Sequence, residues 1–257
     1  MAAFASAAVA ATALGTRSAA AQTTAASPTV VDVLNFALNL EYLEANFYAI
    51  AATGTGLSAA DMGTGAVAPI GTPGKLPLDA ATLALAQALA QDERNHVELL
   101  RTAITSLGGT PIPQPLINYA AQGAVTTQAQ FLIAARQFTA LGNSAYAGSA
   151  QLLVSNASVL TTAAQILGAE GQHAGALNYQ CIVQSLTSPA IDAQDVPPSS
   201  TNFFTVLPAA ALSPARNTSQ VLGVAYGVST ASTTTPPIGK TMGGFFPNGV
   251  NGNVKST

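Results

Sequence analysis

Apolar side chains recur at helical spacing in four segments of the chain, which predicts four long helices. The first helix begins at Ser27-Pro28, an N-cap residue followed by proline at the first helical position, and runs to about Ala52. A connection rich in glycine and proline follows it. The second helix begins after the N-cap candidate Asp79 and runs to Leu107, where two glycines end it.

The other two predicted helices lie between about residues 126 and 186. The third starts at Thr126 or Thr127 and runs to about residue 153, and a cap at Asn156 or Ser158 starts the fourth, which reaches about residue 186. A connection of roughly fifteen to twenty residues separates the second and third helices, which is long enough to cross a bundle. Two helical hairpins joined by one long crossover predict an all-α, ferritin-like four-helix bundle over residues 27–187.

The N-terminal segment, residues 1–26, differs from the predicted bundle. An apolar, alanine-rich run from Met1 to Leu14 is followed by Arg17 and by small residues ending at Gln22, a pattern typical of a signal peptide and its cleavage site. No positive charge precedes the apolar run, so a disordered tail stays an alternative. We expect export to the periplasm, cell surface or extracellular space.

The C-terminal segment, residues 188–257, is dominated by Pro, Ser, Thr and Gly, with apolar islands such as Phe203-Phe204 and Phe245-Phe246. It is too apolar to be simply disordered. We expect a mostly irregular extension that packs on the bundle, with one short helix near Ser219 to Tyr226.

Composition and charge narrow the classes of partner. Hydrophobic residues make up 49% of the 257 residues and charged residues only 7%, with a net charge of −3. Scattered basic residues exclude nucleic acid and anionic membrane surfaces as main partners, and no run of about 18 apolar residues predicts a transmembrane span. The single cysteine, Cys181, excludes an intrachain disulfide and is expected to be an inert core thiol.

The two histidines of the chain carry the strongest chemical signal. His96 follows Glu93 by three residues, and His173 follows Glu170 by three residues. Residues three apart lie on one face of a helix, so each pair directs a carboxylate and an imidazole to the same point. Surface ion pairs are the alternative, but two such pairs in a chain this poor in charge favour metal ligation.

The first predicted helix adds two more carboxylates on its apolar side, Glu41 and Glu44. Buried carboxylates are costly unless they are paired or bound to metal. Glu41 is predicted to be a ligand, whereas Glu44 is either a ligand or a solvated or supporting carboxylate. Tyr48, Tyr146 and Tyr179 are interpreted as core aromatics. The candidate metal ligands are therefore Glu41, Glu44, Glu93, His96, Glu170 and His173; no catalytic residue is assigned.

Several segments carry a family resemblance: residues 37–48, 92–97, 138–146, 170–173 and 243–249. They resemble the desiccation-related, ferritin-like domain family, distant relatives of bacterioferritin and rubrerythrin. The resemblance implies a stress-associated protein. It also implies a dinuclear site that holds one or two ions of iron or manganese.

One position departs from that family pattern. No Asp or Glu lies between Glu98 and Glu170, so the third helix lacks its carboxylate, and the family's glutamate falls on Thr139. We expect one tight and one weak metal position, unless Glu44 turns inward to supply the missing charge.

Two functions from different classes remain. The first is an exported, stress- or desiccation-associated protein that binds iron or manganese, in which a di-metal site acts on dioxygen or peroxide. The second is a non-catalytic structural or surface protein on a degenerate bundle, in which a residual metal only clips the helices together. The sequence does not decide whether there is catalysis, and it leaves a homo-oligomer or surface assembly open.

Overall fold

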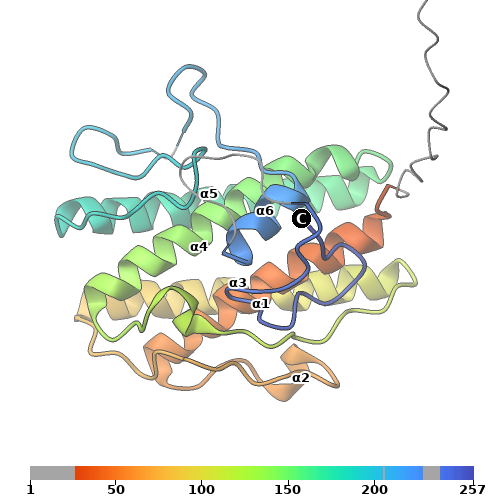
Figure 1. The fold of residues 1–257 in the computed structure, drawn as a ribbon, viewed down its shortest axis with the longest axis horizontal. Coiled ribbons are helices and arrows are strands. Elements are labelled where there is room, and N and C mark those ends of the chain that lie inside the picture. Colours follow the sequence, from red (N-terminus) through yellow and green to blue (C-terminus); the bar gives the residue numbers. More distant parts are fainter. Residues whose placement is uncertain (1–26, 205, 228–237) are drawn as a thin grey trace, which may run out of the picture.

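The computed structural model describes residues 27–204, 206–227 and 238–257. Within these ranges the regular structure is helical, accompanied only by isolated β-bridges. Four long helices lie side by side as a bundle: α1 (Val30–Thr53), α3 (Ala80–Ser106), α4 (Gln128–Ser149) and α5 (Ala157–Val183) (Figure 1). The predicted all-α class with four long helices is confirmed.

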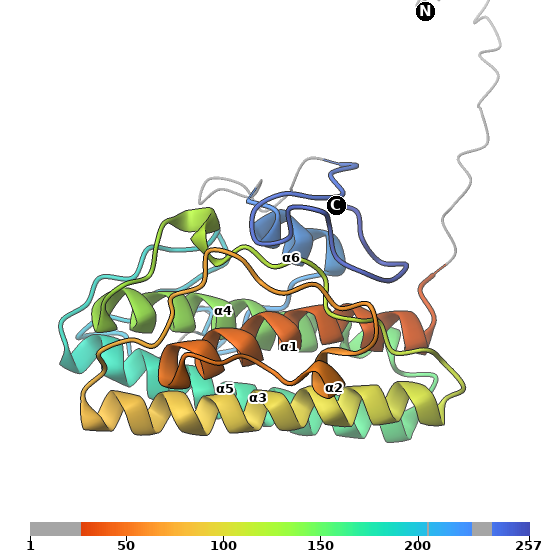
Figure 2. The same cartoon turned by 90° about the horizontal axis from the view of Figure 1, so that it is seen from below.

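The four long helices pack as two helical hairpins, α1 with α3 and α4 with α5. Helix α1 packs most extensively on α3, and α4 packs most extensively on α5, while α1 also contacts α4 (Figure 2). The long connection from α3 to α4 crosses the bundle and contains a short 3-10 helix, η1 (Tyr119–Gln122). This order places α1, α3 and α5, which carry the candidate ligands, around a common interior.

Polar caps set the helix starts. Thr29 caps α1 through a reciprocal pair of hydrogen bonds with Asp32, so the predicted start at Ser27-Pro28 is two residues too early. Asp79 caps α3, as the sequence predicted. Thr127 caps α4, and Asn156 caps α5.

The connection after α1 contains a short helix that the sequence did not predict, α2 (Ala59–Met62). This connection and the crossover pair with one another, because the Ile70 amide donates to the Ile117 carbonyl and the Tyr119 amide donates to the Ile70 carbonyl. Both segments therefore form one layer along the side of the bundle.

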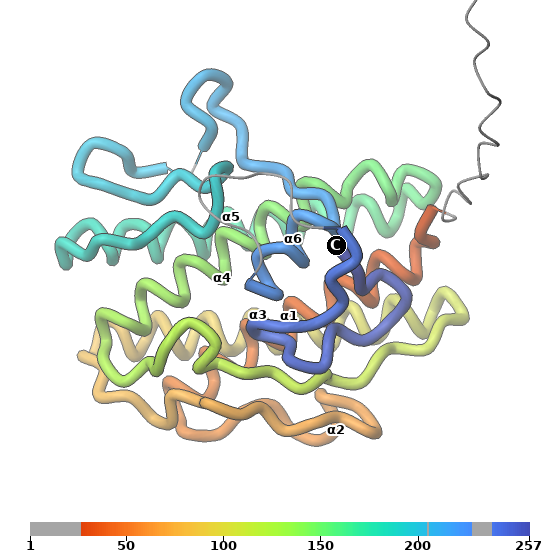
Figure 3. Tube along the Cα trace, viewed as in Figure 1, coloured from red at the N-terminus to blue at the C-terminus, as the bar shows by residue number. Residues whose placement is uncertain are grey.

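The C-terminal segment follows an irregular path across the bundle, as the tube in Figure 3 shows. Its one helix among the described residues, α6 (Thr218–Ala225), packs on α4 and lies where the sequence predicted a short helix. Two buried ion pairs, Arg136 with Asp195 and Arg216 with Asp192, lie at this interface. We infer that they help to hold the segment on the bundle.

No helix among the described residues is long and apolar enough to cross a membrane. The signal-like segment, residues 1–26, lies outside the described residues, so its role stays a prediction.

Candidate metal centre

The structure brings the six candidate ligands into the interior of the bundle. Their exposed fractions run from 0% for Glu93 to 9% for His96. Helix α1 contributes Glu41 and Glu44, and α3 and α5 each contribute one Glu-x-x-His pair.

The imidazole of His96 marks one position in this cluster. Its Nδ1 lies 2.9 Å from Glu93 Oε2, 3.4 Å from Glu41 Oε2 and 3.8 Å from Glu170 Oε1. One ligand atom from each of these four residues lies within 4.8 Å of all the others. Three carboxylates and one imidazole around one point are a suitable donor set for iron or manganese.

The imidazole of His173 marks the other side of the same cluster. Its Nδ1 lies 2.9 Å from Glu93 Oε1 and 3.9 Å from Glu170 Oε1. Its Nε2 lies 3.1 Å from Asp92 Oδ2, which fixes the orientation of the ring. A carboxylate on the far nitrogen is typical of metal-ligating histidines. Sequence reasoning missed Asp92, although it directly precedes Glu93.

Glu44 is turned inward rather than solvated. Its Oε2 accepts hydrogen bonds from the Tyr48 hydroxyl at 2.9 Å and from Thr139 Oγ1 at 3.0 Å. The hydroxyl of Tyr146 donates a short hydrogen bond to Glu41 Oε1. Tyr48 and Tyr146 are thus core aromatics whose hydroxyl groups also hold the two α1 carboxylates.

Tyr179 differs from the other two tyrosines. It is 56% exposed, so its interpretation as a core aromatic is wrong. Tyr179 is six residues after His173 and therefore lies on a different face of α5, whereas Tyr48 is one turn after Glu44 on the inner face of α1.

Helix α4 lines the cluster without a carboxylate of its own. Thr139 is fully buried, and its hydroxyl faces Glu44. Gly142, one turn later, leaves space for the tip of the Glu44 side chain.

Three buried polar atoms test whether a metal fits this cluster. Glu93 Oε1, Glu170 Oε2 and His173 Nδ1 have no hydrogen-bond partner among the described residues. The first and last lie 2.9 Å apart, but without the alignment of a hydrogen bond. An unsatisfied buried polar group costs about 1–3 kcal/mol, and a cation would satisfy all three. The donor set therefore fits a metal centre.

The pKa values reflect the density of charge in the metal-free cluster. Burial raises the pKa of Glu41 to about 7, and it raises the pKa values of Glu44 and Glu170 well above the ordinary range. Burial also acts to raise the pKa of Glu93, but His173 and His96 outweigh it and lower the value to about 2. The pKa of His96 rises to about 11, because Glu41 and Glu93 outweigh its own burial.

These pKa shifts predict that metal binding changes the protonation of the ligands. Without a cation, the raised pKa values of both histidines and of Glu44 and Glu170 favour the protonated forms of these groups. Metal ligation needs neutral imidazole and ionised carboxylates, so binding must release protons.

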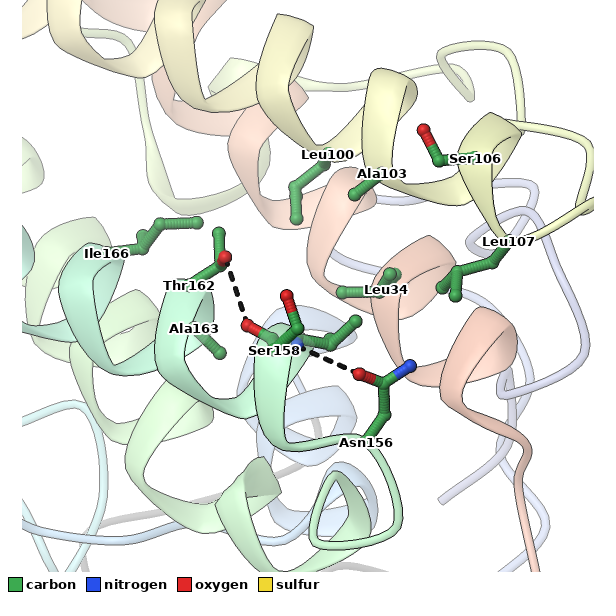
Figure 4. A pocket seen from close by; sticks show the side chains of 11 residues that line it. Leu34, Leu100, Ala103, Ser106, Leu107, Asn156, Ser158, Thr162, Ala163 and Ile166 are labelled. Atoms are coloured by element: carbon green, nitrogen blue, oxygen red, sulfur yellow. Dashed lines mark hydrogen bonds between the residues drawn. The ribbon is translucent and has the colours of Figure 1, made fainter.

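An apolar pocket of about 200 Å³ is lined by residues of α1, α3 and α5, the helices that carry the candidate ligands (Figure 4). Leu34, Leu100 and Ile166 line it, together with residues at the start of α5. Leu100 is one turn after His96 and Ile166 is one turn before Glu170. The pocket therefore begins about one helical turn from the carboxylate-histidine cluster.

A helical bundle with a buried carboxylate-histidine cluster defines the class of ferritin-like proteins. Residues 29–182 match the ferritin-like domain family, and because this is more than half of the chain, the protein belongs to that family.

Among solved structures, the chain is similar to one described as ferritin like, diiron-carboxylate proteins from Bacillus anthracis str. Ames. The identity is 21%, the TM-score is 0.43, and the match covers 58% of this chain and 93% of that one. No curated protein matches the chain.

Proposed function

We propose that this ferritin-like protein binds one or two ions of iron or manganese in the interior of its bundle. The observation that carries the proposal is the convergence of four buried glutamates and both histidines, because three of their polar atoms lack a hydrogen-bond partner among the described residues. The residues that would hold the ions are Glu41, Glu44, Glu93, His96, Glu170 and His173.

Each residue has a role in this proposal. Glu93 contacts both imidazoles, so it is suited to bridge two ions. Asp92 orients His173, and the hydroxyl groups of Tyr48 and Tyr146 orient Glu44 and Glu41. Two such ions, when bound, would supply Lewis-acid and redox chemistry toward small oxidants such as dioxygen or peroxide.

The apolar pocket favours the redox function over a purely structural clip. A small apolar molecule can occupy such a pocket, and dioxygen is one. A metal that only joins the helices needs no pocket beside it. Oxygen consumption by the iron-loaded protein distinguishes the two functions, since a structural clip consumes none.

Metal analysis tests the proposal directly. Protein purified without chelator is expected to carry about one to two ions of iron or manganese per chain by mass spectrometry. His96→Ala combined with His173→Ala should abolish this content. Glu93→Gln should also lower the metal content, and Glu98→Gln is its matched control, since Glu98 is an exposed glutamate on the same helix. Unchanged metal content in the double histidine variant would refute the metal site.

We further propose that the protein is exported and acts in stress or desiccation. The apolar run and the small-residue cleavage pattern before Gln22 support export. N-terminal sequencing of the native protein should find a start near Gln22. A chain that starts at Met1 and fractionates with the cytosol would argue against export.

A further inference from the structure

We infer that α1 supplies the carboxylate that α4 lacks: Glu44 completes the second metal position through a gap that Gly142 leaves in α4. This inference rests on the proposed metal-binding function. It changes the expectation of one tight and one weak position, because the second position regains an anionic ligand.

The space at Gly142 is the first observation. A Cβ atom added to Gly142 would lie 2.5 Å from Glu44 Oε1 and 3.6 Å from Glu170 Oε2. The carboxylate tip of Glu44 therefore occupies the space that any other side chain at this position would take. Residue 142 must be glycine for Glu44 to lie where it does.

The orientation of Glu44 is the second observation. Tyr48 and Thr139 both donate hydrogen bonds to Oε2. These bonds hold that oxygen against α4, while Oε1 lies beside Gly142, which Glu170 Oε2 also approaches. Thr139, which carries a hydroxyl group and no charge, thus orients the Glu44 carboxylate instead of supplying one from α4.

The unpartnered atoms are the third observation. Glu170 Oε2, Glu93 Oε1 and His173 Nδ1 are buried without hydrogen-bond partners among the described residues. They belong to the residues that would share the second position with Glu44. The first position is already served by Glu41 and His96, together with the same two shared glutamates.

Charge balance supports this assignment. Two divalent cations carry four positive charges, and a low-dielectric interior needs matching anions. With two glutamates from α1, one from α3 and one from α5, four carboxylates face the ions. The balance is restored without any acidic residue on α4.

Gly142→Ala is the sharpest test, because it moves the Glu44 carboxylate without removing it. Alanine is a better helix former than glycine, and the clash is with the end of a flexible side chain, so the fold should persist. In calorimetric titrations of the full chain with Mn²⁺, we expect affinity at the second position to fall about 10- to 100-fold while the first is kept. Gly168→Ala is the matched control, since a Cβ there meets open space.

Glu44→Gln is the second variant, and it tests whether Glu44 serves the second metal position even if Gly142→Ala does not fold. It keeps the shape of the side chain but removes the charge, so one of two Mn²⁺ ions should be lost. Two ions with unchanged affinities in both variants would overturn the role of Glu44 and leave the proposed function standing. A wild-type chain with one ion that Glu44→Gln does not affect would also overturn it. A wild-type chain that binds no metal would instead refute the proposed function itself.

Discussion

The buried ion pair between Asp192 and Arg216 offers the most direct test of how the C-terminal segment is held. The Arg216 side chain is 1% exposed and that of Asp192 is 2% exposed. Arg216 Nε donates to Asp192 Oδ2 at 2.8 Å, and its Nη1 donates to Ser144 Oγ on α4 at 2.7 Å. The backbone joins the same contact, because the Arg216 amide donates to the Ser144 carbonyl at 3.0 Å.

Asp192→Ala should be strongly destabilising. Removing one partner of a buried pair costs about 3–5 kcal/mol, because the other charge is left buried without compensation. Asp192 also accepts the amides of Gln194 and Asp195 at 2.9 and 3.0 Å, and losing such bonds adds about 1 kcal/mol. The total is a large fraction of the roughly 5–15 kcal/mol that stabilises a folded domain.

A double variant separates the charge from the packing. Asp192→Leu with Arg216→Met removes both charges and keeps apolar volume, so it should cost less than Asp192→Ala alone. Urea unfolding of the metal-free protein, followed by circular dichroism, measures both. Glu98→Ala is the control, because its pair with Arg94 is about half exposed and should contribute under about 1 kcal/mol. If the double variant is no more stable than the single one, the uncompensated charge is not the cause.

Three further variants and measurements follow from the structure. Gly148→Ala should lower the free energy of unfolding in urea by about 1–3 kcal/mol, because its Cβ would lie 1.9 Å from the Arg216 carbonyl oxygen, which cannot move away as a side chain can. Cys181 should stay unreactive toward a thiol reagent in the native protein and react fully in urea, since it is fully buried and burial raises its pKa. Glu44→Ala should lose the second metal ion, and adding Thr139→Glu should recover it in metal analysis, because the two side chains are in hydrogen-bond contact.

The sequence predicted most of the fold and which carboxylates and imidazoles lie inside the bundle, because both depend on local rules. Residues three apart on a helix share a face, so each Glu-x-x-His pair could be assigned before the helices were packed. Asp79 was identifiable as a cap from residue type and position alone, and the same rule left Thr126 and Thr127 as alternatives, of which Thr127 is the cap. The first cap was misplaced because Ser27-Pro28 is also a favourable start, and only the bonds between Thr29 and Asp32 decide between them.

Two of the groups that support the ligands, Asp92 and Tyr146, were missed because their contacts cross between helices. The hydroxyl of Tyr146 reaches Glu41 from α4, and nothing in the spacing along either helix indicates this bond. The position of Gly142 was informative in the sequence. Glycine inside a helix costs about 1 kcal/mol relative to alanine, which indicates that another contact requires the absence of a side chain. The reason became visible only when Glu44 was placed beside it.

Folding stability alone does not account for the cluster at the centre of this bundle. The chain has five glutamates, and four of them are buried together in the bundle interior, where desolvation raises the cost of their charges. The two imidazoles, whose pKa values are raised by the neighbouring glutamates, offset part of that charge, but three buried polar atoms lack a hydrogen-bond partner among the described residues. Apolar residues of similar size would pack here at lower cost. A bound cation would balance the buried carboxylates and would also satisfy the polar atoms that lack hydrogen bonds. The cluster is therefore best understood as a site whose stability depends on a bound metal ion.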